Sequence, residues 1–348
     1  MRYKKILLCT TLCLCLVLCQ ICKQQSLPVG GVKIQTDESP LVEHLADDSF
    51  TQSVLDIGSF KAAWVRRLYR RLEGLDRPLE ALGSCFELGK KSEGASTFTG
   101  LAPLRRVSLS PPPENGYSKT EINHSYGAAK NGEPHELSKQ SQALFDREGF
   151  AAMTYDKTAP DKLYLSFDCG YENGCTAEIL DILKEKGVKA TFFCTLHQIK
   201  ENPSLTARMI NEGHLIGNHS STHCNFALVS NERISKELED FENYLRENFG
   251  CSTRLFRFPE GAYSLSALKT VNELGYYCCF WSLSYADWDV NNQRGKDFAL
   301  EKLTSRLHGG AVILLHSVSS DNRDCMAEFI DYARAKGYEF ASLETAFE

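Results

Sequence analysis

The chain has 348 residues, of which 43% are hydrophobic and 10% are aromatic, and this is enough apolar material for a folded domain with a substantial core. Its formal net charge is −6, and no stretch of lysine and arginine alternates with aromatic residues. This composition excludes nucleic acid as an expected partner.

The first 23 residues have the pattern of an export signal or a membrane anchor. An apolar run over residues 6–22 is flanked by the basic residues Arg2, Lys4, Lys5 and Lys23. Its length is at the short end of what spans a bilayer, about 17–25 residues. No cleavage site with small residues follows the run. We therefore favour an uncleaved anchor over a cleaved signal peptide, with the rest of the chain outside the cytoplasm.

Residues 24–115 are predicted to be a linker region with one possible helix. Leucine and tyrosine recur at helical spacing between about residues 50 and 82, among arginine and glutamate. The stretch "SLSPPPENGYSKT", residues 108–120, contains three consecutive prolines, which are incompatible with a helix. We expect one catalytic domain over residues 116–348, with its core over residues 160–348.

The cysteines do not form a recognisable framework. Of the 14 in the chain, five lie in the N-terminal apolar run, where they act as small hydrophobic residues. The other nine fit neither a zinc ribbon nor a disulfide pattern, so we expect mainly buried free thiols.

From about residue 160, predicted strands and helices alternate, which is typical of a parallel sheet built from βα units. The expected strands are 162–167, 189–195, 215–220, 253–259, 276–284, 311–316 and 338–343. The expected helices are 176–187, 202–214, 231–250, 264–275, 296–310 and 325–337. The fold class is therefore α/β, and about seven strands suit a distorted (β/α) barrel, in which chemistry is placed at the carboxyl ends of the strands.

Reactive side chains follow several of these strands. They are Asp168 and Cys169, His219 and His223, Arg257, Asp287 and Trp288, and His316. Each has an ordinary alternative, such as a turn-forming aspartate, a surface arginine or a core histidine. The two histidines are four residues apart, so one helical turn would put both rings on the same side, ready for a metal. Together these groups indicate metal-assisted hydrolysis with a general base and a general acid.

The segments "SFDCG", "HSSTH", "RFPEG", "WSLSYADW" and "LLHS" resemble, in order and spacing, the five motifs of the polysaccharide deacetylases. This family is also called carbohydrate esterase family 4 or the NodB-homology family. Other phrases, among them "FDCGYENG", "FWSLSYADW" and "NNQRGK", with "NHSYG" upstream, are similar to the branch of N-acetylmuramic acid deacetylases that act in δ-lactam biosynthesis in sporulating bacteria.

The resemblance implies a role for each matching residue. Asp168 would be the general base and His316 the general acid, and Arg257 would pair with Asp168. His219 and His223 would hold a divalent metal, with zinc the expected ion. The wall of the substrate site would be formed by Asp287, Trp288 and, in the "YENG" turn, Tyr171.

The chain departs from the family pattern at three positions. Cys169 stands where the family has a metal-binding aspartate, so it is either a thiolate ligand that would suit Zn²⁺ or a bystander. Ser284 replaces the aspartate that tunes the acid, and Glu260 replaces a basic or aromatic residue.

The implied function is removal of N-acetyl groups from the N-acetylmuramic acid of peptidoglycan. The alternatives are an N-acetylglucosamine or chitooligosaccharide deacetylase, and an inactive barrel that binds the cell wall. We expect a monomer outside the cytoplasm, attached to the membrane through its N-terminal segment, with the spore cortex as the site implied by the resemblance.

Overall fold

The computed structural model describes residues 114–125 and 127–347. The N-terminal apolar run, the expected helix between residues 50 and 82, and Cys85 therefore lie outside the described residues. In the part of the chain that is described, no helix is long and apolar enough to cross a membrane.

The main sheet contains eight strands, and every pairing between them is parallel. Its members are β2 (Ala152–Met153), β3 (Lys162–Cys169), β4 (Thr191–Cys194), β5 (Leu215–Asn218), β6 (Leu255–Phe256), β8 (Tyr277–Cys279), β9 (Val312–His316) and β10 (Glu339–Phe340). Their order is β10-β3-β4-β5-β6-β8-β2, with β9 also paired to β3. Beyond β8, an isolated bridge joins Leu283 to Ile313 of β9, which itself pairs with β3, so the curled sheet closes on itself through β9.

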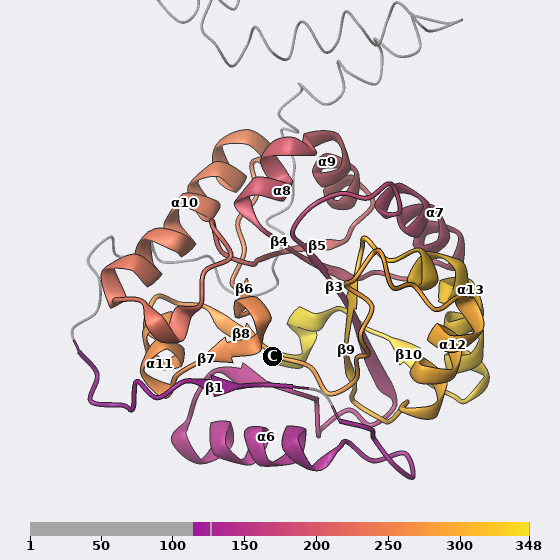
Figure 1. Ribbon diagram of the computed structural model, residues 1–348, viewed down its shortest axis with the longest axis horizontal. Helices are drawn as coiled ribbons and strands as arrows, with labels where there is room; N and C mark the ends of the chain where they lie inside the picture. Colours follow the sequence, from indigo (N-terminus) through magenta and orange to yellow (C-terminus); the bar gives the residue numbers. More distant parts are fainter. Residues whose placement is uncertain (1–113, 126, 348) are drawn as a thin grey trace, which may run out of the picture. The chain divides into compact units, whose positions relative to one another are not determined.

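Helices cover the outside of this sheet (Figure 1). They are α6 (Glu136–Glu148), α7 (Thr176–Lys186), α8 (Leu196–Glu201), α9 (Pro203–Asn211), α10 (Asn231–Phe249), α11 (Leu265–Glu273), α12 (Lys296–Ser305) and α13 (Ser320–Ala335). The predicted distorted barrel is confirmed. All seven predicted strands are present, although β6 and β10 have only two residues each, and the eighth strand, β2, which is equally short, was not predicted.

A small antiparallel pair accompanies the barrel. It joins β1 (Ile122–Asn123) to β7 (Ala262–Tyr263), and the backbone N–H of His124 then donates to the carbonyl of Gly261. The segment before α6 is thereby attached to the loop that follows β6.

Successive side chains of β3 point alternately to the helices outside the barrel and to its interior. Leu163, Leu165, Phe167 and Cys169 belong to the apolar cluster that also contains residues of α7 and α13. Tyr164, Ser166 and Asp168 occupy the alternate positions, whose side chains leave the opposite face of a strand. Tyr164 packs there with Phe193, Trp281 and Leu314, inside the barrel.

Helix α10 shows why the sequence forms these outer helices. Ser230 caps its first turn by accepting a hydrogen bond from the N–H of Arg233, and Gly250 ends it with a φ of 71°. Ile234, Leu238, Phe241 and Leu245 recur every three or four residues and are buried against the barrel.

One buried carboxylate on α10 has an incomplete set of partners. Glu242 accepts a hydrogen bond from the N–H of Thr253 at 3.3 Å through Oε2, while Oε1 has no partner among the described residues. Burial raises the pKa of Glu242 from 4.5 to about 7.

Replacing Glu242 with glutamine is expected to remove a pH-dependent loss of stability. A carboxyl whose folded pKa is raised stabilises the fold below its unfolded pKa, and this contribution is lost as the pH rises through the folded value. The wild-type chain should therefore lose on the order of 3 kcal/mol more than Glu242→Gln between pH 5 and pH 8. Urea unfolding of both proteins at the two pH values measures this difference, and parallel pH dependences would contradict it.

Candidate active site

A large groove lies at the carboxyl ends of the barrel strands. Its volume is about 1050 Å³, and the residues that line it include Asp168 near the end of β3, Thr195 after β4, His219 after β5 and His316 at the end of β9. Parallel strands deliver their last side chains to one edge of the sheet, which is why residues distant in the chain meet in this groove.

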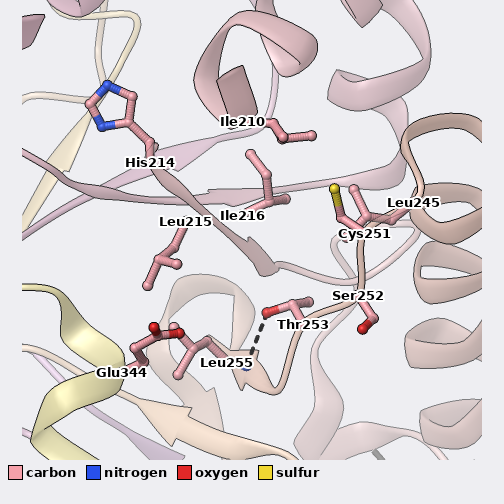
Figure 2. Close-up of a pocket in the computed structure, with 10 residues that line it drawn as sticks. All are labelled: Ile210, His214, Leu215, Ile216, Leu245, Cys251, Ser252, Thr253, Leu255 and Glu344. Atoms are coloured by element: carbon pink, nitrogen blue, oxygen red, sulfur yellow. Dashed lines mark hydrogen bonds between the residues drawn. The ribbon is translucent and has the colours of Figure 1, made fainter. Parts of the chain in front are cut away.

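A second hollow, shown in Figure 2, lies at the opposite ends of two of these strands, where β5 and β6 begin. Its volume is about 20 Å³, which is enough for roughly one water molecule. It is lined mainly by apolar side chains, and the only hydrogen bond drawn there runs from the N–H of Leu255 to Oγ1 of Thr253. The candidate site is therefore the groove.

Asp168 is a buried carboxylate held by an arginine. Arg257 donates from Nη1 to Oδ1 of Asp168 at 2.8 Å. Oδ2 lies 3.5 Å from Nε2 of His219. Burial alone would raise the pKa of Asp168, but the charge and the hydrogen bond of Arg257 contribute most to outweighing it, and the pKa is held below its ordinary value. The carboxylate is therefore ionised at neutral pH.

Arg257 is fully buried and makes several contacts that fix its orientation. It donates to the carbonyl of Cys279 at 2.8 Å and to Oγ of Ser166 at 2.9 Å. Its guanidinium also lies 4.1 Å from the centre of the Phe193 ring. Because these contacts fix the guanidinium, they also fix the orientation of the Asp168 carboxylate.

The two histidines of the second motif lie close together, but not on a helix. β5 ends at Asn218, and residues 219–223 form a loop in which Ser220 has a φ of 70° and His223 a φ of 57°. The expectation of a helical turn was wrong, because these left-handed residues bend the chain instead. The rings of His219 and His223 still meet, with centroids 5.0 Å apart. We call residues 219–223 the histidine loop.

The hydrogen bonds of His219 determine which of its ring nitrogens is free. Nδ1 lies 2.9 Å from the carbonyl of Arg257, which can only accept, so Nδ1 carries the proton. Burial lowers the pKa of His219 to about 4, so the ring is neutral at pH 7. The lone pair of Nε2 therefore faces the ionised Oδ2 of Asp168, and two such acceptors favour a cation between or beside them.

This donor chemistry fits a divalent metal in part. Neutral imidazoles with one ring nitrogen fixed by a backbone carbonyl are common metal ligands. Within residues 114–125 and 127–347, however, no group of three or more His, Cys, Asp or Glu side chains is arranged to hold a metal ion. The protein would supply the two imidazoles of His219 and His223, and the remaining positions would be left to water or substrate.

Cys169 does not join this set. Its side chain is fully buried in the apolar cluster outside the barrel, opposite Cys194 in the register of β3 and β4. The residue is absent from the lining of the groove, whereas the adjacent Asp168 is present. Neighbouring residues of a strand point to opposite faces, so the thiol points away from the groove and from the two histidines, and the structure favours the bystander alternative over a Cys-His-His site. All eight cysteines of the described residues are free, as expected for buried thiols.

Asp287 lies beneath His316 rather than in the wall of the groove. It is only 2% exposed, and its Oδ1 lies 2.7 Å from Nδ1 of His316. Its Oδ2 accepts from the backbone N–H of His316 at 2.7 Å and from Nδ2 of Asn322 at 2.6 Å. The expectation that Asp287 contacts substrate was wrong, because these three contacts bury the carboxylate.

The contact with Asp287 sets the protonation of His316. Burial alone would lower the pKa of His316, but the charge of Asp287 and its hydrogen bond outweigh burial and raise the pKa above its ordinary value. Asp287 thus supplies what the serine at position 284 cannot, a negative charge against the imidazole.

Two aromatic side chains stand exposed at the groove, as expected for Tyr171 and Trp288. They are 47% and 50% exposed, and both belong to the lining. The Trp288 ring lies edge-on to His316, with centroids 5.9 Å apart.

Among the lining residues that were not assigned a role from the sequence is His124. His124, in the "NHSYG" phrase before the first predicted strand, is buried and contacts the carbonyl of Trp281 through Nε2 at 2.8 Å. Only that local phrase could have drawn attention to it, because no periodic pattern surrounds it.

Comparison with known proteins identifies the family. A family model described as polysaccharide deacetylase matches residues 155–279. The peptidoglycan-N-acetylmuramic acid deacetylase PdaA of Bacillus subtilis is 37% identical over 224 residues, which are 64% of this chain and 84% of that protein. An uncharacterized 30.6 kDa protein of Geobacillus stearothermophilus is 38% identical over 228 residues, which cover 65% of this chain and 85% of the relative.

The chain belongs to the polysaccharide deacetylase family. The solved structure of Bacillus subtilis PdaA, a family 4 carbohydrate esterase, matches with a TM-score of 0.63 at 36% identity, over 66% of this chain and 97% of that one. A family 4 carbohydrate esterase from Bacillus anthracis matches with a TM-score of 0.55, also at 36% identity, over 67% and 98%. The family indicated by the five motifs is thus confirmed, the branch indicated by the other local phrases agrees with the similarity to PdaA, and the chain is a hydrolase of the deacetylase class.

Proposed function

We propose that this deacetylase removes the acetyl group from N-acetylmuramic acid residues of peptidoglycan. Its similarity to PdaA supports that sugar over N-acetylglucosamine, since a peptidoglycan-N-acetylglucosamine deacetylase of Bacillus cereus is 31% identical over 192 residues, against 37% over 224 for PdaA. The substrate is accordingly a glycan strand of the cell wall.

The observation that carries the proposal is that one groove holds a carboxylate paired with an arginine, Asp168 with Arg257, and an imidazole paired with a buried carboxylate, His316 with Asp287. Burial raises the pKa of Asp168, but Arg257 outweighs burial and lowers it. Burial lowers the pKa of His316, but Asp287 outweighs burial and raises it. A carboxylate kept ionised beside an imidazole kept protonated is the arrangement required of a general base and a general acid.

The proposed reaction uses these two groups in sequence. Asp168 accepts a proton from the attacking water, which forms a bond to the carbonyl carbon of the amide. His316 then donates its proton to the nitrogen as the carbon–nitrogen bond breaks, so that acetate and a free amine are released. Each transfer is an acid–base step of the kind that contributes about 10²–10⁴-fold to rate.

His219 and His223 would hold the metal, for which we propose Zn²⁺ because imidazole ligands suit it. When bound, a divalent ion polarises the amide carbonyl and lowers the pKa of water. Asp168 stays outside the ligand set in this proposal, since Arg257 already occupies its Oδ1.

Further groups in the groove suit a sugar amide. The exposed rings of Tyr171 and Trp288 offer flat apolar surfaces to a pyranose ring. Two buried polar atoms of lining residues, Nε1 of Trp281 and Oγ of Ser284, have no hydrogen-bond partner among the described residues. Buried polar groups are rarely left unpaired, which is consistent with partners supplied by substrate or water.

We further infer that residues 116–348 form the catalytic unit and that residues 1–23 export or anchor it, with residues 24–115 between them. A peptidoglycan substrate requires the catalytic unit to act outside the cytoplasm as part of the cell envelope. We propose that it works as a monomer, because the groups named above all come from one chain.

Defined glycan fragments test the function. The full-length chain, supplied with zinc, is incubated with peptidoglycan fragments, and mass spectrometry locates each loss of an acetyl group. We expect free amines on muramic acid and release of acetate. Amines only on glucosamine would establish the alternative sugar, and glycan binding without acetate release would establish an inactive barrel.

Replacing Asp287 with asparagine is expected to shift the alkaline limb of the pH–rate profile to lower pH. The substitution removes the charge that holds the pKa of His316 up, so the acid loses its proton at a lower pH. Activity should fall about tenfold at pH 8 and less at pH 6, within the range for one acid–base group. Asp289→Asn, at an exposed carboxylate two residues away, is the matched control and should leave the limb in place. An unmoved limb in Asp287→Asn would show that another group tunes His316.

A further inference from the structure

We propose that Glu237 on α10 is a positioning residue for the histidine loop and thereby sets how tightly His219 and His223 bind a divalent metal. The inference rests on the proposed function, because it requires those two imidazoles to be the metal ligands. Neither the five motifs nor the comparisons assign a role to Glu237.

The Glu237 carboxylate binds both residues in the middle of the loop. Its Oε2 accepts from the backbone N–H groups of Ser221 at 2.8 Å and Thr222 at 2.7 Å. Its Oε1 accepts from Oγ1 of Thr222 at 2.7 Å, and Oγ of Ser221 donates to the backbone carbonyl of Glu237 at 2.8 Å. Four hydrogen bonds therefore join one turn of α10 to the segment between the two histidines.

Glutamate side chains are mostly exposed in folded proteins, but that of Glu237 is buried. Glu237 is 1% exposed, and a buried carboxylate is costly unless charge and hydrogen bonds compensate it. Arg233, one turn earlier on α10, supplies the charge at 2.6 Å from Oε1 and also donates to Oγ1 of Thr222 at 3.1 Å. The carboxylate is thus fully committed to the loop and its neighbour on the helix.

The loop needs external support because of its backbone conformation. Ser220 and His223 are both left-handed, at φ values of 70° and 57°. Such conformations cost on the order of 1 kcal/mol or more for residues other than glycine, and they persist where the surroundings enforce them. Within the loop, the N–H of His223 donates to Oγ of Ser220 at 2.9 Å. Glu237 holds the two residues between these bends.

The support from Glu237 links the position of His223 to the affinity of the site for a divalent metal. His219 is buried and held at Nδ1 by the carbonyl of Arg257, whereas His223 is exposed at the far end of the loop. If the middle of the loop is released, His223 samples other positions, and metal binding must then order it. Groups that orient metal ligands typically change affinity by 10–100-fold when they are replaced.

The test compares two buried glutamates of the same helix. Full-length wild type, Glu237→Gln and Glu242→Gln are stripped of metal and titrated with Zn²⁺ against a chromophoric chelator. Glutamine at position 237 keeps the side-chain volume but places an amide among donors. We expect zinc affinity to fall 10–100-fold in Glu237→Gln and to stay within about threefold of wild type in Glu242→Gln, since Glu242 contacts Thr253 outside the loop.

Two further measurements separate positioning from general destabilisation. Thermal unfolding without metal should show that Glu237→Gln is folded at the assay temperature, and excess zinc should restore most of its acetate release. Thr222→Val, at an exposed residue, removes one of the four bonds and should lower zinc affinity severalfold. If Glu237→Gln does not fold, an unchanged affinity in Thr222→Val overturns the proposal.

His223→Ala distinguishes failure of this inference from failure of the proposed function. If His223→Ala leaves the zinc affinity of the wild-type chain unchanged, the two-histidine site itself is wrong. If His223→Ala weakens binding while Glu237→Gln binds zinc as tightly as wild type, the site stands and the positioning role of Glu237 is overturned.

Discussion

Replacing Asp168 with asparagine is expected to lower acetate release by about 10³-fold at neutral pH, because it removes the group that we propose as the base for the attacking water. The amide oxygen of asparagine can still accept from Nη1 of Arg257, which donates to Oδ1 of Asp168 at 2.8 Å in the wild type. The variant should therefore fold, with a loss of stability on the order of 1–3 kcal/mol. Acetate release under zinc saturation, together with circular dichroism and urea unfolding, measures both effects.

The adjacent residue provides the matched control. Cys169→Ala changes the neighbour of Asp168 on the same strand, but its side chain lies in the apolar cluster on the other face of β3. We expect acetate release and zinc affinity close to wild type, with a loss of stability of about 1 kcal/mol from the cavity. Zinc affinity that falls in Cys169→Ala would restore the thiolate ligand, and full activity in Asp168→Asn would remove Asp168 from the role of base.

Replacing Arg257 with methionine is expected to have the largest effect on stability, about 3–5 kcal/mol, because it leaves the buried carboxylate of Asp168 without its charge partner. Burial raises the pKa of Asp168, and without the charge of Arg257 to lower it the pKa would rise. The base would need a higher pH to ionise, so the acid limb of the pH–rate profile should move upward. Arg257→Lys keeps the charge but loses the forked geometry, and its loss of stability should be smaller.

A double variant shows whether the unpaired charge is the cause. Asp168→Asn with Arg257→Met removes both charges, so the pair should be destabilised by less than the sum of the two single variants. Urea unfolding of the four proteins gives this interaction energy. Additive losses would mean that Arg257 stabilises the fold through its packing against Phe193 and its bonds to backbone carbonyls, independently of Asp168.

Two titratable groups of the groove each have a partner of the opposite charge: Asp168 is paired with Arg257, and His316 with Asp287. Arg257 is fully buried and donates to Oδ1 of Asp168, so the ionised form of Asp168 is favoured. Asp287 is buried beneath His316 and has Asn322 as a further hydrogen-bond donor. Each partner is itself held by several hydrogen bonds, so neither has to reorganise during the reaction.

Much of the fold and part of the site could be predicted from the residue pattern alone. The seven predicted strands and the predicted helices between them are present because apolar residues recur at the spacing that each element requires. Asp168, His219 and His316 meet in the groove because each lies at or just after the end of a parallel strand, and such ends converge. These predictions depend on local order along the chain and on the geometry common to all parallel barrels.

Other features were decided only by tertiary packing. Helices α7 and α13 pack against one face of β3, the face that carries the thiol of Cys169. The other face points into the barrel, so Asp168 reaches the groove and Cys169 does not. The pairing of Asp287 with His316 spans 29 residues, and the support of the histidine loop by Glu237 spans 15 or 16. Such contacts depend on how elements lie against one another, and hydrophobic periodicity within a single element carries no information about the partner of a polar side chain.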